Sequence, residues 1–253
     1  MMPEFIVAGL WGLVSGSGLL VGATIADAFF GRLTHSMIAA IMGFGGGVLI
    51  AVVGTELIGG QDPAGLGPLA ILALLAGAAI FSGNNWYLAR RGAKHRKRCG
   101  ECTEQPSEGQ HQGSGTAIAL GSVLDGIPEA LVIGMSVAGG RGISLAIVAG
   151  FFLANVPQGL SSASGMKLAG RSRRYIYAVW IGIPVLVCMS AGAGYIVLGS
   201  AETLAPAILS FAAGAVIAML AETMIPEAFE KAPPFIGLIT VMGFLAAYLL
   251  AQH

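Results

Sequence analysis

Charged residues are scarce in this sequence, at 10% of the chain against the roughly 25% of a soluble domain. This scarcity excludes an ordinary water-soluble fold, and the mean hydropathy of +0.80 indicates a membrane protein. Cysteines number only three, which excludes a disulfide framework. The net charge is zero, so the composition gives no sign of nucleic-acid binding.

Motifs of several enzyme classes are also absent. The sequence has no phosphate-binding glycine loop, which argues against nucleotide hydrolysis, and no His-Glu-x-x-His, which a zinc protease needs. A serine protease would need a base in the membrane. None is expected, since all four histidines fall in loops or at the ends of apolar runs: His35, His95, His111 and His253. We therefore predict that the protein is not an enzyme.

Eight apolar segments are long enough to cross a bilayer, which takes roughly 20 residues. They cover about residues 5–30, 35–59, 66–89, 116–138, 142–168, 175–199, 203–228 and 233–251. The first segment lacks a basic leader, so we expect a membrane helix there and not a cleavable signal. The predicted fold class is an all-α membrane protein, with residues 1–253 as one transmembrane domain of eight helices.

The basic residues predict the orientation of these spans. With the N-terminus outside, twelve of the thirteen Lys and Arg residues fall in inner loops, and only Arg141 lies outside. Both termini are therefore expected on the exterior or periplasmic side of a bacterial inner membrane. Residues 90–115 would form a flexible basic cytoplasmic loop between the third and fourth spans. This loop could hold a soft metal, although a solvated loop that enforces topology is the simpler interpretation; the residues concerned are His95, Cys99, Cys102 and His111.

Several carboxylates fall inside the apolar segments, at Asp27, Glu56, Asp125, Glu129, Glu222 and Glu227. Each costs about 2.5–3.5 kcal/mol on membrane-insertion scales. The deep ones have no obvious basic partner in the sequence, because Lys and Arg occur in loops or at span ends. A proton or a bound cation would therefore have to neutralise them, which points to the handling of protons or cations.

Two stripes of oxygen-bearing side chains recur at helical spacing. On the fourth span Ser122, Asp125 and Glu129 share one face, and on the fifth Asn155, Gln158 and Ser162 repeat the spacing. If the stripes face each other, they form a cation site between the two spans. For the serines alone, hydrogen bonding between helices is the simpler interpretation.

Prolines accompany these polar segments. Pro128, Pro157 and Pro226 each remove the amide partner of the carbonyl four residues earlier. Each proline thus supplies a free oxygen acceptor next to a polar side chain. Broken helices of this kind near the middle of the membrane are a common construction for ion sites in transporters, and we expect them here.

The chain resembles the ZIP (Zrt/Irt-like) family of divalent metal transporters on these motifs. The family's His-Asn-x-Pro-Glu-Gly is matched by "DGIPEA" at 125–130, and its fifth-span motif is matched by "ANVPQG" at 154–159. Its seventh-span His-Glu-x-x-Pro places Glu222 before Pro226. The stretch "GFGGGVLIAVVGTELI" at 43–58 resembles the family's glycine-rich second helix, which implies that Glu56 lies near the cavity. The resemblance implies eight spans in a 3+2+3 bundle.

The departures from the family motifs affect the expected metal site. Asp125 stands where the family has histidine, and Gln158 stands where it has the glutamate that bridges two metals. A single site is therefore more plausible than a binuclear one. Its ligands would all be oxygen atoms, which suit hard ions such as manganese, whereas the family resemblance implies zinc or iron. The metal ligands implied are Asp125, Glu129, Asn155, Gln158, Glu222 and Glu56.

These observations predict a secondary transporter that carries a divalent metal cation across the inner membrane. Zinc is the first expectation, with iron and manganese as further candidates, and the metal is the substrate and not a catalytic cofactor. The expected partners are the cation and the lipid bilayer, with a homodimer as a candidate assembly and no nucleic acid. The alternative is a diverged ZIP-like protein that transports another solute, or that senses metal without transporting it.

Overall fold

The computed structural model describes residues 2–29, 32–59, 66–93, 114–138, 144–198, 202–230 and 232–252. Most of these residues are helical, and none of them lies in a strand. The α-helices are α1 (Glu4–Ala28), α2 (His35–Val52), α3 (Pro68–Leu88), α4 (Ser114–Ala138), α5 (Leu145–Leu168), α6 (Arg173–Leu198), α7 (Ala205–Met219), α8 (Ile225–Glu230) and α9 (Ile236–Leu250). Three π-helical segments extend or connect them: η1 (Val53–Ile58), η2 (Ala89–Ala93) and η4 (Leu220–Met224). A short 3-10 turn, η3 (Glu202–Leu204), precedes α7.

Seven helical stretches in the described part of the chain are long and apolar enough to cross a membrane. They agree with an all-α, multi-pass membrane protein and with the first seven expected spans. The eighth expected span, 233–251, contains only the 15-residue α9, which is shorter than the roughly 20 residues of an upright crossing. Pro233 and Pro234 lack backbone N–H groups, and Phe235 has a left-handed φ of 65° before α9 begins.

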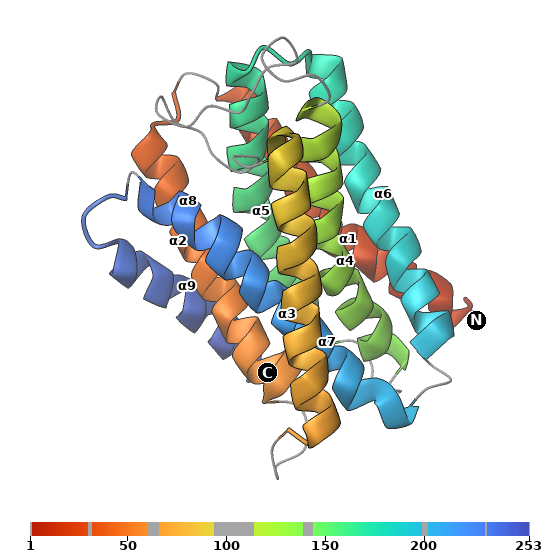
Figure 1. The fold of residues 1–253 in the computed structure, drawn as a ribbon. Helices are drawn as coiled ribbons and strands as arrows, with labels where there is room; N and C mark the ends of the chain where they lie inside the picture. The colour runs from red at the N-terminus through yellow and green to blue at the C-terminus, as the bar shows by residue number, and fades with distance from the viewer. Residues whose placement is uncertain are drawn as a thin grey trace.

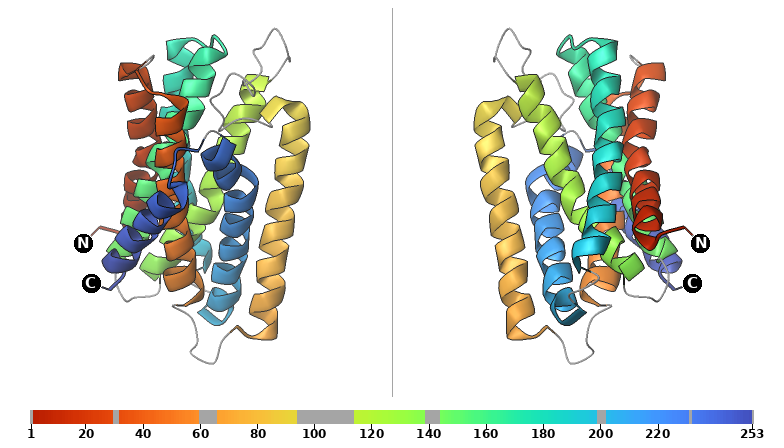
Figure 2. Two further views of the ribbon diagram at one scale, coloured as in Figure 1. Left: turned by 90° about the vertical axis from the view of Figure 1, so that its left-hand side faces the viewer. Right: turned by 90° about the vertical axis from the view of Figure 1, so that its right-hand side faces the viewer.

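The helices form one bundle in which successive long helices run in opposite directions (Figures 1 and 2). Both chain ends lie in the same half of this bundle (Figure 2). The described basic residues gather at the other end, where α1, α3 and α5 finish and α2 and α6 begin: Arg32, Arg90, Arg91, Lys167, Arg171, Arg173 and Arg174. We call this the basic end. Most of the predicted loop 90–115 lies outside the described residues, and this includes His95, Cys99, Cys102 and His111. Arg141 and His253 also lie outside them.

Reciprocal glycines bring three pairs of helices into backbone contact. A methyl group at Gly22 on α1 would lie 2.0 Å from the carbonyl oxygen of Val156 on α5, and one at Gly159 would lie 2.1 Å from that of Leu19. Small residues at such crossings let membrane helices pack closely. The same reciprocal arrangement joins α3 to α7 through Gly77 and Gly214, and α2 to α9 through Gly47 and Gly243.

The proline segments differ from the expected broken helices. Both α4 and α5 continue as α-helices through Pro128 and Pro157. Of these three prolines, only Pro226 is preceded by a change of helix type, where η4 separates α7 from α8. A proline near the middle of a long helix removes one hydrogen bond, and close packing by neighbouring helices compensates for this in α5, which is buried along most of its length.

Asp27 has basic partners that the sequence did not indicate. Its carboxylate lies 2.6 Å from Nζ of Lys167 and 2.7 Å from a guanidinium nitrogen of Arg173, and Tyr177 donates a hydrogen bond to it over 3.2 Å. Asp27 lies near the end of α1, so residues at the ends of α5 and α6 reach it. Asp27 is therefore not one of the deep carboxylates to which the expectation of no basic partner applies, and its network joins α1, α5 and α6 at the basic end.

Replacing Gly77 by alanine tests the backbone contact between α3 and α7. The new methyl group would lie 1.9 Å from the carbonyl oxygen of Phe211, so the helices must separate. We expect a loss of about 1–3 kcal/mol in the free energy of unfolding, seen as a lower midpoint in a thermal denaturation of the detergent-solubilised protein. Gly83→Ala is the matched control on the same helix, because nothing lies within 4 Å of its added methyl group. Equal midpoints for the two variants would contradict the packing described.

Candidate functional site

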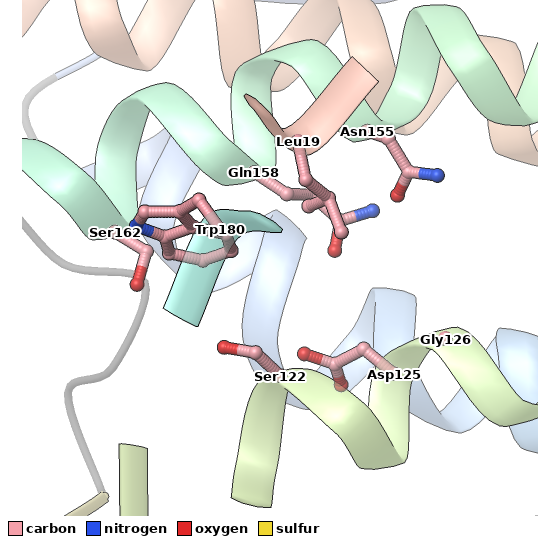
Figure 3. A pocket seen from close by; sticks show the side chains of 8 residues that line it. All are labelled: Leu19, Ser122, Asp125, Gly126, Asn155, Gln158, Ser162 and Trp180. Atoms are coloured by element: carbon pink, nitrogen blue, oxygen red, sulfur yellow. The ribbon is translucent and has the colours of Figure 1, made fainter. Parts of the chain in front are cut away.

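A small cavity lies between α1, α4, α5 and α6 (Figure 3). It has room for about one water molecule. The lining combines one carboxylate, two hydroxyls, two amides and one indole: Leu19, Ser122, Asp125, Gly126, Asn155, Gln158, Ser162 and Trp180. The two stripes predicted from the sequence therefore reach the same cavity.

The two walls of the cavity carry different chemical groups. Asp125 and Ser122 of α4 lie on one side, and the amides of Asn155 and Gln158 of α5 lie on the other (Figure 3). Asp125 is 4% exposed and Gln158 is 3% exposed. No residue in this described lining carries a positive charge. A buried carboxylate facing neutral oxygen atoms forms a surface that attracts a cation.

Glu129 adds a second carboxylate beside the cavity. It is 1% exposed, and Nδ2 of Asn155 donates a hydrogen bond to its Oε2 over 2.8 Å. The same Nδ2 also donates to the backbone carbonyl of Ser15 on α1 over 3.3 Å. Both amide hydrogens of Asn155 are thereby used, which fixes the orientation of the amide and leaves its Oδ1 to act as an acceptor or metal ligand.

Two lining features were not predicted from the sequence. Trp180 on α6 is 1% exposed, and within the described part of the chain its indole N–H has no hydrogen-bond partner. The hydroxyl of Ser15, close to Asn155, is likewise buried without such a partner among these residues. Neither residue belongs to a polar stripe or to a proline motif, so their positions follow only from how α1 packs on α5 and how α6 packs on α1 and α4.

Glu56 and Glu222 do not line this cavity. Glu56 in η1 accepts a hydrogen bond of 3.2 Å from the hydroxyl of Ser144, the N-cap of α5. Glu222 in η4 is exposed and accepts hydrogen bonds from Ser82 and from Asn85 on α3, the latter over 2.6 Å. The structure thus brings together four of the six predicted ligands, Asp125, Glu129, Asn155 and Gln158, and places the other two at separate positions.

The tetrad Ile-Pro-Glu-Ala occurs twice in the sequence, at 127–130 and at 225–228, and the second copy places another carboxylate against α5. Glu227 of α8 is 6% exposed and accepts a hydrogen bond of 2.6 Å from the hydroxyl of Ser161. In the first tetrad Glu129 accepts from Asn155 on the same helix. Each tetrad therefore presents its glutamate to a polar side chain of α5, at positions roughly 9 Å apart along the helix axis.

The donor set allows binding of a hard cation but does not form a cluster typical of zinc. Within the residues described, no group of three or more His, Cys, Asp or Glu side chains gathers closely enough to hold a metal. The set beside the cavity instead has two carboxylates supplemented by amide and hydroxyl oxygens. Neither the models of known protein families nor the curated protein sequences give a match to this chain.

Asn155→Asp tests the pairing of Asn155 with Glu129. The new carboxylate cannot donate to Glu129 and places a second negative charge about 3 Å from it, in a buried position. We expect the free energy of unfolding of the metal-free variant to fall by more than about 1–3 kcal/mol, which is the cost of losing one hydrogen bond to a buried group. The measurement is the thermal midpoint in detergent with a chelator present.

Asn85→Asp is the matched control for this change. Asn85 also donates to a glutamate, Glu222, but that carboxylate is exposed at the bundle surface and not enclosed by protein, so the two negative charges can move apart. We expect the free energy of unfolding of this variant to fall by about 1 kcal/mol or less. Equal losses at the two positions would contradict the buried Asn155–Glu129 contact.

Proposed function

We propose that the protein is a secondary transporter that carries a divalent metal cation across the membrane. The observation that supports this function best is the placement of Asp125 and Glu129. These carboxylates are 4% and 1% exposed, lie at or beside one small cavity, and belong to a helix of membrane-spanning length. Groups this costly to bury within a span are most often used to bind ions or protons.

Four side chains would bind the cation. Asp125 supplies a carboxylate from α4, and Glu129 supplies a second one one helical turn further along. Asn155 contributes Oδ1, because both hydrogens on its Nδ2 are engaged. Gln158, which also lines the cavity, contributes its amide oxygen. Two negative charges balance a divalent cation, so the loaded site would be close to neutral in the low-dielectric interior of the bundle.

Two arguments bear on the identity of the metal, and they favour different ions. The resemblance of "DGIPEA" and "ANVPQG" to ZIP motifs favours zinc or iron. The all-oxygen donor set favours a harder ion, of which manganese is the candidate closest to both. A single metal is favoured over two, since Gln158 stands where the family's bridging glutamate would be.

Glu56 and Glu222 would act away from the central site. Each lies in a π-helical segment, and such segments occur often at functional positions. We assign them to secondary binding positions along the route of the cation, in the bacterial inner membrane. The ion's own gradient, or proton exchange at the carboxylates, would drive movement.

A diverged ZIP-like protein that moves another solute, or that senses metal without transport, is the second candidate. It is favoured by the lack of a close group of three His, Cys, Asp or Glu side chains in the described residues. Weak metal affinity, or binding without release to the other side, would follow from so sparse a ligand set.

Flux into proteoliposomes tests the transport proposal. Zinc, manganese, iron(II), cadmium and magnesium are each supplied outside vesicles that contain wild type, Asp125→Asn or Glu129→Gln. We expect saturable uptake of at least one metal by the wild type and a loss of at least about tenfold in each variant, because each variant lacks one of two charged ligands.

Glu4→Gln is the control for these variants. Glu4 is a carboxylate at the far end of α1, where it accepts a hydrogen bond from Tyr195, and its loss should leave uptake unchanged. Absence of uptake for every metal, with correctly folded protein, would refute transport. Metal binding by such protein would then favour the sensor, and no binding would favour transport of another solute.

A further inference from the structure

Arginine and aromatic side chains pair at the basic end of α3. The guanidinium carbon of Arg90 lies 3.9 Å from the centre of the Trp86 ring, and that of Arg91 lies 5.4 Å from the Tyr87 ring. Trp86 is 58% exposed and Tyr87 is 52% exposed. Stacking of this kind holds the guanidinium groups above the rings and restricts their motion.

The order of ring and guanidinium follows the direction of each helix. On α3, which runs towards the basic end, the rings come before the arginines in sequence. At the start of α6, which runs away from it, Arg171 just before the helix precedes Tyr175 and Arg173 precedes Tyr177, with guanidinium-to-ring distances of 5.7 Å in both pairs. On both helices the charge therefore lies on the outer side and the ring on the inner side. This is the arrangement of a membrane interface, where amphipathic rings lie at headgroup level.

The dimensions of α3 agree with this placement. From Pro68 to Tyr87 the helix rises roughly 28 Å, close to the about 30 Å thickness of the hydrocarbon core. It is also the least buried of the seven long apolar stretches, and its outward side chains include Leu72 and Leu75. Arg90 lies about 6 Å beyond Trp86, which matches the depth of the polar headgroup layer.

The positive charges of Arg90 and Arg91 are not used within the described part of the protein. Among the residues that the structure describes, ion pairs join Asp27 to Lys167 and Arg173, and no carboxylate contacts either arginine of η2. Two adjacent exposed guanidinium groups at phosphate depth complement the charge of an anionic headgroup, and guanidinium binds phosphate oxygens in a bidentate manner.

We propose that Arg90, Arg91, Trp86 and Tyr87 form a binding surface for an anionic phospholipid at the basic end of α3. The headgroup phosphate lies against the two guanidinium groups, and the acyl chains run along the exposed apolar face of α3. The rings of Trp86 and Tyr87 mark the boundary between these two parts. This surface is distinct from the cation cavity, so it does not depend on the transport proposal.

Fluorescence quenching of Trp86 tests this surface. The full-length protein is placed in phosphatidylcholine vesicles that contain a small fraction of brominated phosphatidylglycerol or, in parallel, brominated phosphatidylcholine. The signal of Trp86 is the difference between wild type and Trp86→Phe. We expect phosphatidylglycerol to quench it more than phosphatidylcholine at equal mole fraction. The apparent affinity should fall about fivefold for each arginine replaced by glutamine.

Arg174→Gln is the matched control, because it removes one exposed charge at the same end, and no ring among the described residues lies against this guanidinium. It should leave the quenching unchanged. Equal quenching of the wild type by the two lipids would overturn the proposal, and so would an equal loss in Arg90→Gln and Arg174→Gln. Raising the salt to about 1 M gives a test on wild type alone, since a charge-based preference should then disappear and its persistence would contradict the site.

Discussion

The cost of burying a carboxylate in a membrane-spanning bundle governs the rest of this structure. Asp125 and Glu129 are almost inaccessible on a helix of membrane-spanning length, so each needs polar neighbours. Glu129 has the amide of Asn155, and Asp125 faces the cavity with Ser122 and Gln158 around it. If stability were the only requirement, apolar side chains would be expected at these two positions, because buried ionic groups rarely add net stability. Their presence therefore argues for binding.

Close packing of α1 on α5 supports this polar arrangement. A methyl group at Gly18 would lie 2.4 Å from the carbonyl oxygen of Phe152 and 3.0 Å from Cβ of Asn155, so only glycine permits this approach. The approach brings the backbone carbonyl of Ser15 within 3.3 Å of Nδ2 of Asn155. The amide is then held between Ser15 and Glu129, and its oxygen remains for a ligand. Glycine packing and the ligand geometry are therefore linked through Asn155.

The sequence predicted the parts of the site that lie on single helices. Helical spacing placed Asp125 with Ser122, and Asn155 with Gln158, because positions three or four apart share a helix face. It could not place side chains that depend on packing between helices. Trp180 reaches the cavity only because α6 packs beside α4 and α1, and Asp27 finds Lys167 only because α1 and α5 end together. The π-helical segment before Pro226 had no signature that distinguished it from the continuous helices at the other prolines.

The most direct test of the central claim is to locate a bound ion. Crystals of the purified protein soaked in manganese would be measured on both sides of the manganese absorption edge, with Asp125→Asn crystals treated identically. The account predicts an anomalous peak in the cavity within coordination distance of the Asp125 carboxylate and Asn155 Oδ1, and no peak in the variant. A wild-type cavity without a peak, with manganese bound only elsewhere, would contradict the account.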